Sequence, residues 1–140
     1  MRLHPVPVVI ALIVVTSTGA ALAASPLVGS GKLTVVPPAY FTGSSGADTI
    51  EGTSGNDVVQ GRGGNDILRG LAGNDILDGG TGNDRVYGGK GRDTVRGGAG
   101  NDYLYARDGM RDVVDGGPGF DRAWVDRFDV VRNVERVFRR

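Results

Sequence analysis

The chain repeats a nine-residue unit without interruption, and this repeat constrains its fold more than any other feature. Residues 79–105 read GGTGNDRVY, GGKGRDTVR and GGAGNDYLY when they are divided every nine residues. The same frame extends back to Gly43, which gives seven uninterrupted units over residues 43–105. It continues through a ten-residue unit (106–115) and a final nine-residue unit (116–124). Self-similarity at a short fixed period predicts a solenoid in place of an ordinary globular domain.

Three positions of the unit hardly vary. Position four is Gly in all seven uninterrupted units. Position six is always Asp: Asp48, Asp57, Asp66, Asp75, Asp84, Asp93, Asp102, Asp112 and Asp121. Position eight is always aliphatic: Ile50, Val59, Leu68, Leu77, Val86, Val95, Leu104, Val114 and Ala123. Because three residues are enough for a minimal strand, we expect a short strand around position eight, with that side chain facing a thin apolar core.

The first six residues of each unit predict a tight, oxygen-rich turn. Gly adopts positive φ at little cost, and Asn tolerates the left-handed region better than most residues, so we expect the chain to curl at position five. Asn occupies that position in five units: Asn56, Asn65, Asn74, Asn83 and Asn101. The carbonyls of such a turn, followed by the position-six carboxylate, would suit Ca²⁺, which takes six to eight oxygen ligands.

Two units per coil would stack equivalent turns every eighteen residues, with odd and even units lining opposite edges. Asp66 and Asp84 would then lie about one strand spacing apart, roughly 4.8 Å. Two unpaired charges at ~5 Å repel by roughly 3 kcal/mol at an effective dielectric of ~20, and a bridging cation removes that repulsion. Since the core is thin and the chain has no Cys for disulfides, we expect folding to be coupled to metal binding.

The segment before the repeats divides into two parts. Residues 1–23 combine a short basic start, an apolar run and an Ala-Leu-Ala end, which predicts a secretory signal peptide cleaved near Ala23 and a secreted, extracellular protein. The apolar run is shorter than the ~20 residues that span a bilayer, so we expect no membrane span after cleavage. Residues 24–42 are interpreted as a linker or an N-terminal cap, with a possible short strand at 32–36.

Residues 125–140 follow the repeats and place apolar residues among charged ones. They are interpreted as a C-terminal cap, a closing strand over the otherwise exposed end of the solenoid.

Composition excludes several kinds of chemistry. His4 is the only His and there is no Cys, so thiolate and imidazole metal sites, Ser–His triads and Cys nucleophiles are excluded from residues 24–140. The net charge of zero gives no reason to expect nucleic acid or an anionic membrane as a partner. Arg far outnumbers Lys, which favours a bacterial source.

The units quoted above resemble the RTX (repeats-in-toxin, hemolysin-type) calcium-binding nonapeptide repeats. The resemblance implies a right-handed parallel β-roll, all-β, of about nine repeats, with Ca²⁺ held between adjacent turns at no more than about seven sites. The implied side-chain ligands are Asp57, Asp66, Asp75, Asp84, Asp93 and Asp102 first, then Asp48, Asp112 and Asp121. The implied backbone carbonyl loops are those of Gly79, Gly80, Gly82, Gly88, Gly89, Gly91, Gly97, Gly98 and Gly100.

Two departures from the repeat carry expectations of their own. Position two is Gly only from Gly80 onward, with Ser44, Thr53, Arg62 and Leu71 before it, so the first half is expected to bind calcium less tightly. The residue inserted between Gly109 and Asp112 is expected to distort one edge.

The resulting hypothesis is a secreted, non-enzymatic calcium-binding β-roll with a structural or interaction role. One alternative is a hydrolase using paired carboxylates, although only Glu51 and Glu135 are glutamates and the aspartates are already explained by metal binding. Another is an ice-binding solenoid, which would need a regular Thr array, whereas position seven offers Thr only at Thr49 and Thr94.

Overall fold

The computed structural model describes residues 39–140, and these residues form twelve short strands. They are β1 (Ala39–Thr42), β2 (Thr49–Glu51), β3 (Asp57–Gly63), β4 (Ile67–Arg69), β5 (Ile76–Thr81), β6 (Arg85–Tyr87), β7 (Thr94–Ala99), β8 (Tyr103–Ala106), β9 (Val113–Asp115), β10 (Arg122–Val125), β11 (Val130–Arg132) and β12 (Arg136–Arg139). The predicted signal peptide and the possible strand at 32–36 lie outside the described residues. The described part of the chain contains no helix that is long and apolar enough to cross a membrane.

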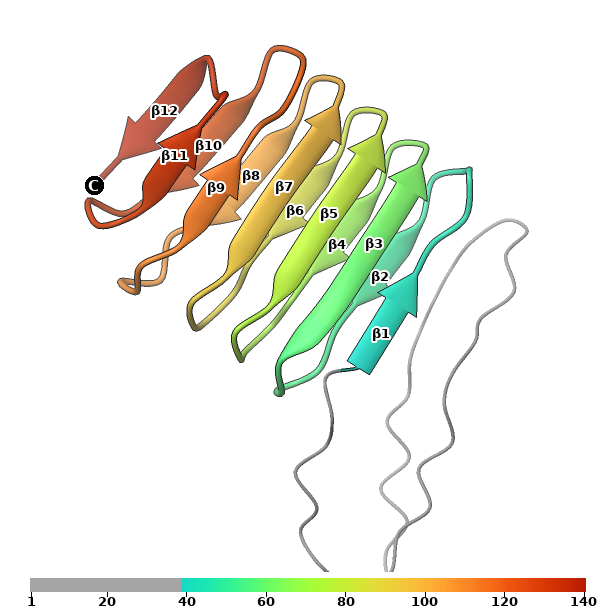
Figure 1. Ribbon diagram of the computed structural model, residues 1–140, viewed down its shortest axis with the longest axis horizontal. Coiled ribbons are helices and arrows are strands. Elements are labelled where there is room, and N and C mark those ends of the chain that lie inside the picture. The colour runs from blue at the N-terminus through green and yellow to red at the C-terminus, as the bar shows by residue number, and fades with distance from the viewer. Residues whose placement is uncertain (1–38) are drawn as a thin grey trace, which may run out of the picture.

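The strands alternate between two parallel sheets, so that one coil contributes one strand to each (Figure 1). One sheet has the order β1-β3-β5-β7-β9-β11, and the other has the order β12-β10-β8-β6-β4-β2. Equivalent positions of successive coils lie opposite each other, as in the pairs Val59 with Leu77 and Leu68 with Val86. The predicted all-β parallel solenoid with two units per coil is therefore confirmed.

The interior follows the period of two that a strand imposes. All nine position-eight side chains are at most 1 % exposed, as predicted. Position six and position one of the next unit also face inward, as Asp84, Val86 and Gly88 illustrate, because residues two apart lie on the same face of a strand. The core is thus an aliphatic row flanked by buried carboxylates and glycines.

The solenoid is longer at both ends than the repeat count indicates. Strand β1 pairs with β3 and buries Phe41 beside Val59, so residues 39–42 form part of a coil although they lack the glycine signature. After the last unit, β11 and β12 each extend one of the two sheets, in place of a single capping strand. Twelve strands in two sheets make about six coils.

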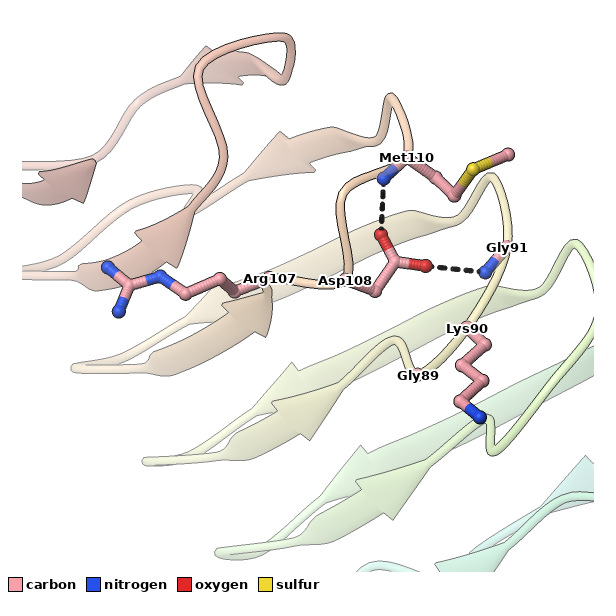
Figure 2. A pocket seen from close by; sticks show the side chains of 6 residues that line it. All are labelled: Gly89, Lys90, Gly91, Arg107, Asp108 and Met110. Atoms are coloured by element: carbon pink, nitrogen blue, oxygen red, sulfur yellow. Dashed lines mark hydrogen bonds between the residues drawn. The ribbon is translucent and has the colours of Figure 1, made fainter. Parts of the chain in front are cut away.

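The ten-residue unit is accommodated within one loop. Pairing continues from β7 to β9, but the register changes from eighteen to nineteen residues, as in Thr94 with Val113. Figure 2 shows how Asp108 fills the break, with one carboxylate oxygen accepting the Gly91 N–H and the other accepting the Met110 N–H, both at 2.7 Å. The expected distortion is confined to this loop, which borders a hollow lined by Gly89, Lys90, Gly91, Arg107, Asp108 and Met110.

Candidate metal centre

The position-six aspartates form two ladders inside the solenoid. All nine are at most 2 % exposed. The Oδ1 atom of a ladder aspartate accepts the backbone N–H of the aspartate one coil earlier, at 2.7 Å from Asp66 to Asp84 and 2.9 Å from Asp75 to Asp93. This bond turns each carboxylate toward the preceding coil and stacks the predicted ligands along both edges of the core.

The second carboxylate oxygen has no such partner in most coils. Oδ2 is buried without a hydrogen bond in Asp66, Asp75, Asp84, Asp93, Asp102, Asp112 and Asp121. An ionised carboxylate oxygen that loses water without gaining a partner costs several kcal/mol, so a proton or a cation is needed at these atoms. Seven such atoms recur along the two ladders, and each of them needs a proton or a cation as a partner.

Six of the seven unpartnered oxygens face a space that a position-one glycine keeps open; the exception is Asp112, whose unit begins with Ala106. A Cβ on Gly79 would meet both Oδ2 of Asp84 and the carbonyl oxygen of Gly97, one coil later. The same arrangement recurs at Gly61 and at Gly70. At these positions a side chain would collide with oxygen atoms from two successive coils, which explains why position one is Gly in eight of the nine units.

Positions two and four supply the sharp curvature of the turn. Gly80 and Gly82 have φ of 99° and 128°, and a Cβ on either would collide with the carbonyl group of the equivalent residue one coil earlier. The predicted carbonyl-loop glycines at these positions behave alike: Gly80, Gly82, Gly89, Gly91, Gly98 and Gly100 all have positive φ. Stacked turns therefore bring backbone carbonyls from adjacent coils close together.

The expected role of the position-five asparagines is wrong. Among the described residues, positive φ outside glycine occurs only at Arg62, Leu71 and Asn133. The asparagine side chains instead accept backbone N–H groups one coil later, as Asn65 Oδ1 does from Asn83 at 2.8 Å. The neighbouring glycines, and not the asparagines, provide the positive φ that turns the chain. The asparagine side chains connect adjacent coils through hydrogen bonds.

Burial disturbs the acidity of the ladder carboxylates. Loss of solvent, with smaller contributions from neighbouring ladder carboxylates, raises the pKa of Asp75 and Asp112 to about 7 and the pKa of Asp66 and Asp102 to about 6. The backbone N–H that each carboxylate accepts opposes this pKa shift without cancelling it. Burial likewise raises the pKa of the following carboxyls: Asp84, Asp93, Asp121 and Asp129.

The first two units satisfy their carboxylates differently. Thr53 donates its hydroxyl to both carboxylate oxygens of Asp57, at 3.1 and 3.0 Å, and its backbone N–H to Oδ2. Ser44 donates its hydroxyl to Oδ2 of Asp48 at 2.9 Å. A hydroxyl at position two thus occupies oxygens that later coils leave free, which gives a structural reason for weaker calcium binding in the first two units but not in the next two, where Asp66 and Asp75 keep a free Oδ2.

Two ladder members were missed by the repeat pattern. Asp129 Oδ1 accepts the Asp112 N–H at 3.0 Å, and Glu135 Oε2 accepts the Asp121 N–H at 2.7 Å. Glu135, interpreted from sequence as lying outside the repeat, therefore continues one ladder. The signal that identifies both is an acid two residues before an aliphatic that pairs with a position-eight residue, as in Asp129-Val130-Val131 and Glu135-Arg136-Val137, without the glycine turn.

The ladder carboxylates can form a site for a hard cation only together with backbone carbonyl oxygens. Within residues 39–140, no three acidic or histidine side chains converge on one point. A site here must therefore combine a carboxylate oxygen with carbonyl oxygens of the glycine turns. That donor set, all oxygen and partly neutral, is one that Ca²⁺ accepts.

The fold and the ladders together define a parallel β-solenoid whose glycine turns enclose two rows of buried carboxylates. The family model described as RTX calcium-binding nonapeptide repeat (4 copies) matches residues 42–77 and 78–109. Residues 42–109 therefore match RTX calcium-binding nonapeptide repeats, as the sequence resemblance implied. No curated protein and no solved structure matches the chain.

Proposed function

We propose that this protein is a secreted calcium-binding β-roll that folds when Ca²⁺ binds and that acts outside the cell in a structural or interaction role. The observation that carries the proposal is the row of buried Oδ2 atoms without partners. All but that of Asp112 lie beside a space kept open by a position-one glycine, where a cation supplies the charge that the protein itself does not.

The residues proposed to hold each ion come from two adjacent coils. In the best-formed part of the array they include the Asp84 carboxylate and turn carbonyls such as that of Gly97. The aspartates with a free Oδ2 are the principal candidates, whereas Asp48 and Asp57 rank lower because Ser44 and Thr53 already donate to them. Asp129 and Glu135 extend the rows, which adds one further inter-turn space at each edge.

Folding and binding are coupled because the hydrogen bonds between the coils are supported by only a thin apolar core and by no disulfide. Each coil contacts mainly its neighbours, the core is one inward row of side chains from each sheet, and there is no Cys. Ionised ladder carboxylates repel along both rows, and this repulsion disappears when a cation lies between the coils. Metal binding then contributes directly to the free energy of folding.

The alternatives fit the geometry less well. A carboxylate hydrolase needs acids that reach a substrate, whereas the position-six aspartates are buried beneath the turns. An ice-binding face needs a regular Thr array, and the outward row through β1 to β11 contains a single Thr, Thr94. Export rests on residues 1–23, whose sequence predicts a signal peptide.

Circular dichroism of the full chain tests the coupling. We expect little β-structure in EGTA, a cooperative gain of β-signal with Ca²⁺ at about 10⁻⁴ to 10⁻³ M as for extracellular modules, and no equivalent gain with Mg²⁺. Isothermal titration calorimetry would count the ions. A chain that is fully folded in EGTA and indifferent to Ca²⁺ would overturn the proposal.

A further inference from the structure

The outer face of the sheet β1-β3-β5-β7-β9-β11 carries an exposed apolar row. One outward residue from each strand lies in register: Tyr40, Val58, Ile76, Thr94, Val113 and Val130. Tyr40, Ile76 and Val113 are 69 %, 44 % and 38 % exposed. Figure 1 shows the six strands side by side, with no described segment crossing this face.

A second row beside it alternates in charge. Two residues further along each strand lie Thr42, Gln60, Asp78, Arg96, Asp115 and Arg132. From β5 onward the signs therefore read minus, plus, minus, plus. Between described residues the structure contains a single salt bridge, Arg69 with Glu51, and it lies on the opposite sheet. The alternating row thus has no ion pair of its own within residues 39–140.

The opposite sheet satisfies its outer face internally. Tyr87, Tyr105, Trp124 and Phe138 stack with ring centroids 4.5 to 4.8 Å apart, so most ring faces are covered by the next ring. Arg69 lies over the Tyr87 ring, 5.7 Å from its centroid, at the end of that stack. The apolar row therefore lacks the partner that the aromatic row finds within the molecule.

We propose that the apolar row packs against a second copy of this chain, forming a two-fold symmetric, face-to-face dimer. The two-fold axis runs parallel to the strands and passes between β5 and β7. This axis places the apolar row of one copy on the apolar row of the other. Ile76 then lies opposite Thr94 of the second copy, and Val58 lies opposite Val113 of the second copy. In the charged row it places Asp78 opposite Arg96 of the second copy, twice by symmetry.

The charge pattern selects this register over its neighbours. An axis on β5 would place Asp78 opposite its own copy, and an axis on β7 would place Asp78 opposite Asp115 of the other chain. Like charges in contact cost several kcal/mol. An axis along the solenoid and between the two rows would place the apolar row on the charged row, and an axis along the apolar row would leave each charged row without a facing charged row. An axis between β7 and β9 is also complementary in charge, but it leaves β1 and β3 without a facing strand.

The size of the face predicts weak, reversible association. Six strands at ~4.8 Å and about 10 Å of strand length give a flat area of a few hundred Å², below the ~800 Å² per partner of a standard stable interface. We therefore expect a dimer that dissociates on dilution. The inference depends on the solenoid fold and goes beyond calcium binding.

Charge exchange between β5 and β7 tests the dimer in a way that a simple loss of folding cannot imitate. Sedimentation velocity of the full chain in saturating Ca²⁺, from about 10 µM to about 1 mM, should show a monomer–dimer equilibrium. Asp78→Arg alone and Arg96→Asp alone should each weaken self-association at least about tenfold, because like charges then face each other twice. An equimolar mixture of the two variants should dimerise again, since residue 78 of one chain then faces a residue 96 of opposite sign in both pairs.

Arg85→Asp, on the outer face of the opposite sheet, is the matched control and should leave association unchanged. Circular dichroism in Ca²⁺ must show that each variant is folded. A variant that fails to fold with Ca²⁺ is thereby distinguished from a folded variant that fails to dimerise. A wild-type chain that stays monomeric over the whole range, or a mixture that does not dimerise when the single variants are folded, would overturn the proposal.

Discussion

The two oxygens of a ladder carboxylate have different roles, as Asp84 illustrates. Asp84 Oδ1 accepts the Asp66 N–H at 2.7 Å, which positions the side chain and connects two coils. Oδ2 of the same residue is buried without a partner, and burial raises the pKa of Asp84. One side chain therefore supplies a structural hydrogen bond and a charge that a cation must balance.

Asp84→Asn separates these two roles. The amide retains an oxygen for the Asp66 N–H but carries no charge, so the coil should still form while its calcium sites weaken. Isothermal titration calorimetry should count at least one fewer tightly bound ion per chain. Asp78→Asn, on the outer face of the sheet, should bind the same number as wild type. An unchanged ion count in Asp84→Asn would contradict the role assigned to this residue.

Position two offers a substitution that should stabilise the protein. Leu71 has φ of 78° where later units have Gly, and its side chain is 42 % exposed, so it pays backbone strain for little packing. Positive φ costs an L-residue about 1–2 kcal/mol, and added chain entropy offsets part of the relief. Leu71→Gly should therefore raise the free energy of unfolding by up to about 1 kcal/mol, measured by denaturant unfolding in saturating Ca²⁺. Leu71→Ala, which keeps the strain, should not. Destabilisation by Leu71→Gly would show that the strain is absent.

At the scale of elements, the C-terminal coils are stabilised outside their core as well as inside it. The C-terminal coils have a small core residue, Ala123, but their outer face carries the aromatic stack that crosses β6, β8, β10 and β12. Trp124 lies between Tyr105 and Phe138, at 4.7 and 4.8 Å. Stacking outside the sheet therefore compensates for the thin interior of the last coils.

Trp124→Ala should destabilise the calcium-loaded protein by about 2–3 kcal/mol, because it removes an inner ring of the stack and three aromatic contacts. Denaturant unfolding followed by circular dichroism measures this difference. Tyr40→Ala removes an aromatic that is 69 % exposed at the other end and should cost less than about 1 kcal/mol. Equal losses in the two variants would mean that the stack contributes nothing beyond local packing.

At the scale of the whole molecule, protons and calcium compete for the same rows of carboxylates. Asp66, Asp75, Asp102 and Asp112 have pKa values of about 6 to 7 in the folded chain, against 3.8 for ordinary Asp. A raised folded-state pKa means that the metal-free fold is favoured below pH 3.8 and loses that stability as the pH rises through 6 to 7. Acid should therefore partly replace calcium.

Circular dichroism in EGTA should show more β-structure near pH 4.5 than at pH 7.5, and the Ca²⁺ concentration at the folding midpoint should be higher at pH 5.5 than at pH 7.5. Each proton that Ca²⁺ must displace weakens apparent binding by up to about tenfold per pH unit below the pKa. Greater β-structure in EGTA at pH 7.5 than at pH 4.5 would contradict this assignment of the buried carboxylates.

The repeat by itself determined the coil of eighteen residues, the aliphatic row at position eight and the two lines of position-six aspartates. These follow from periodicity, because a fixed short repeat forces equivalent residues into register. The same reasoning did not find Asp129 and Glu135, since those coils lack the glycine turn on which the pattern depends. It also assigned the asparagines to backbone conformation, although their partners lie one coil away.

Only the tertiary structure decided which way the polar side chains face and what they contact. An aspartate at position six reads as part of a polar turn, yet strand alternation places it inside, beside the aliphatic row. The hydrogen bonds that hold it, the oxygens left without partners and the outer rows of charge all join residues about eighteen positions apart. Contacts of that kind depend on how successive coils stack, and a unit of nine residues considered alone contains no partner with which to make them.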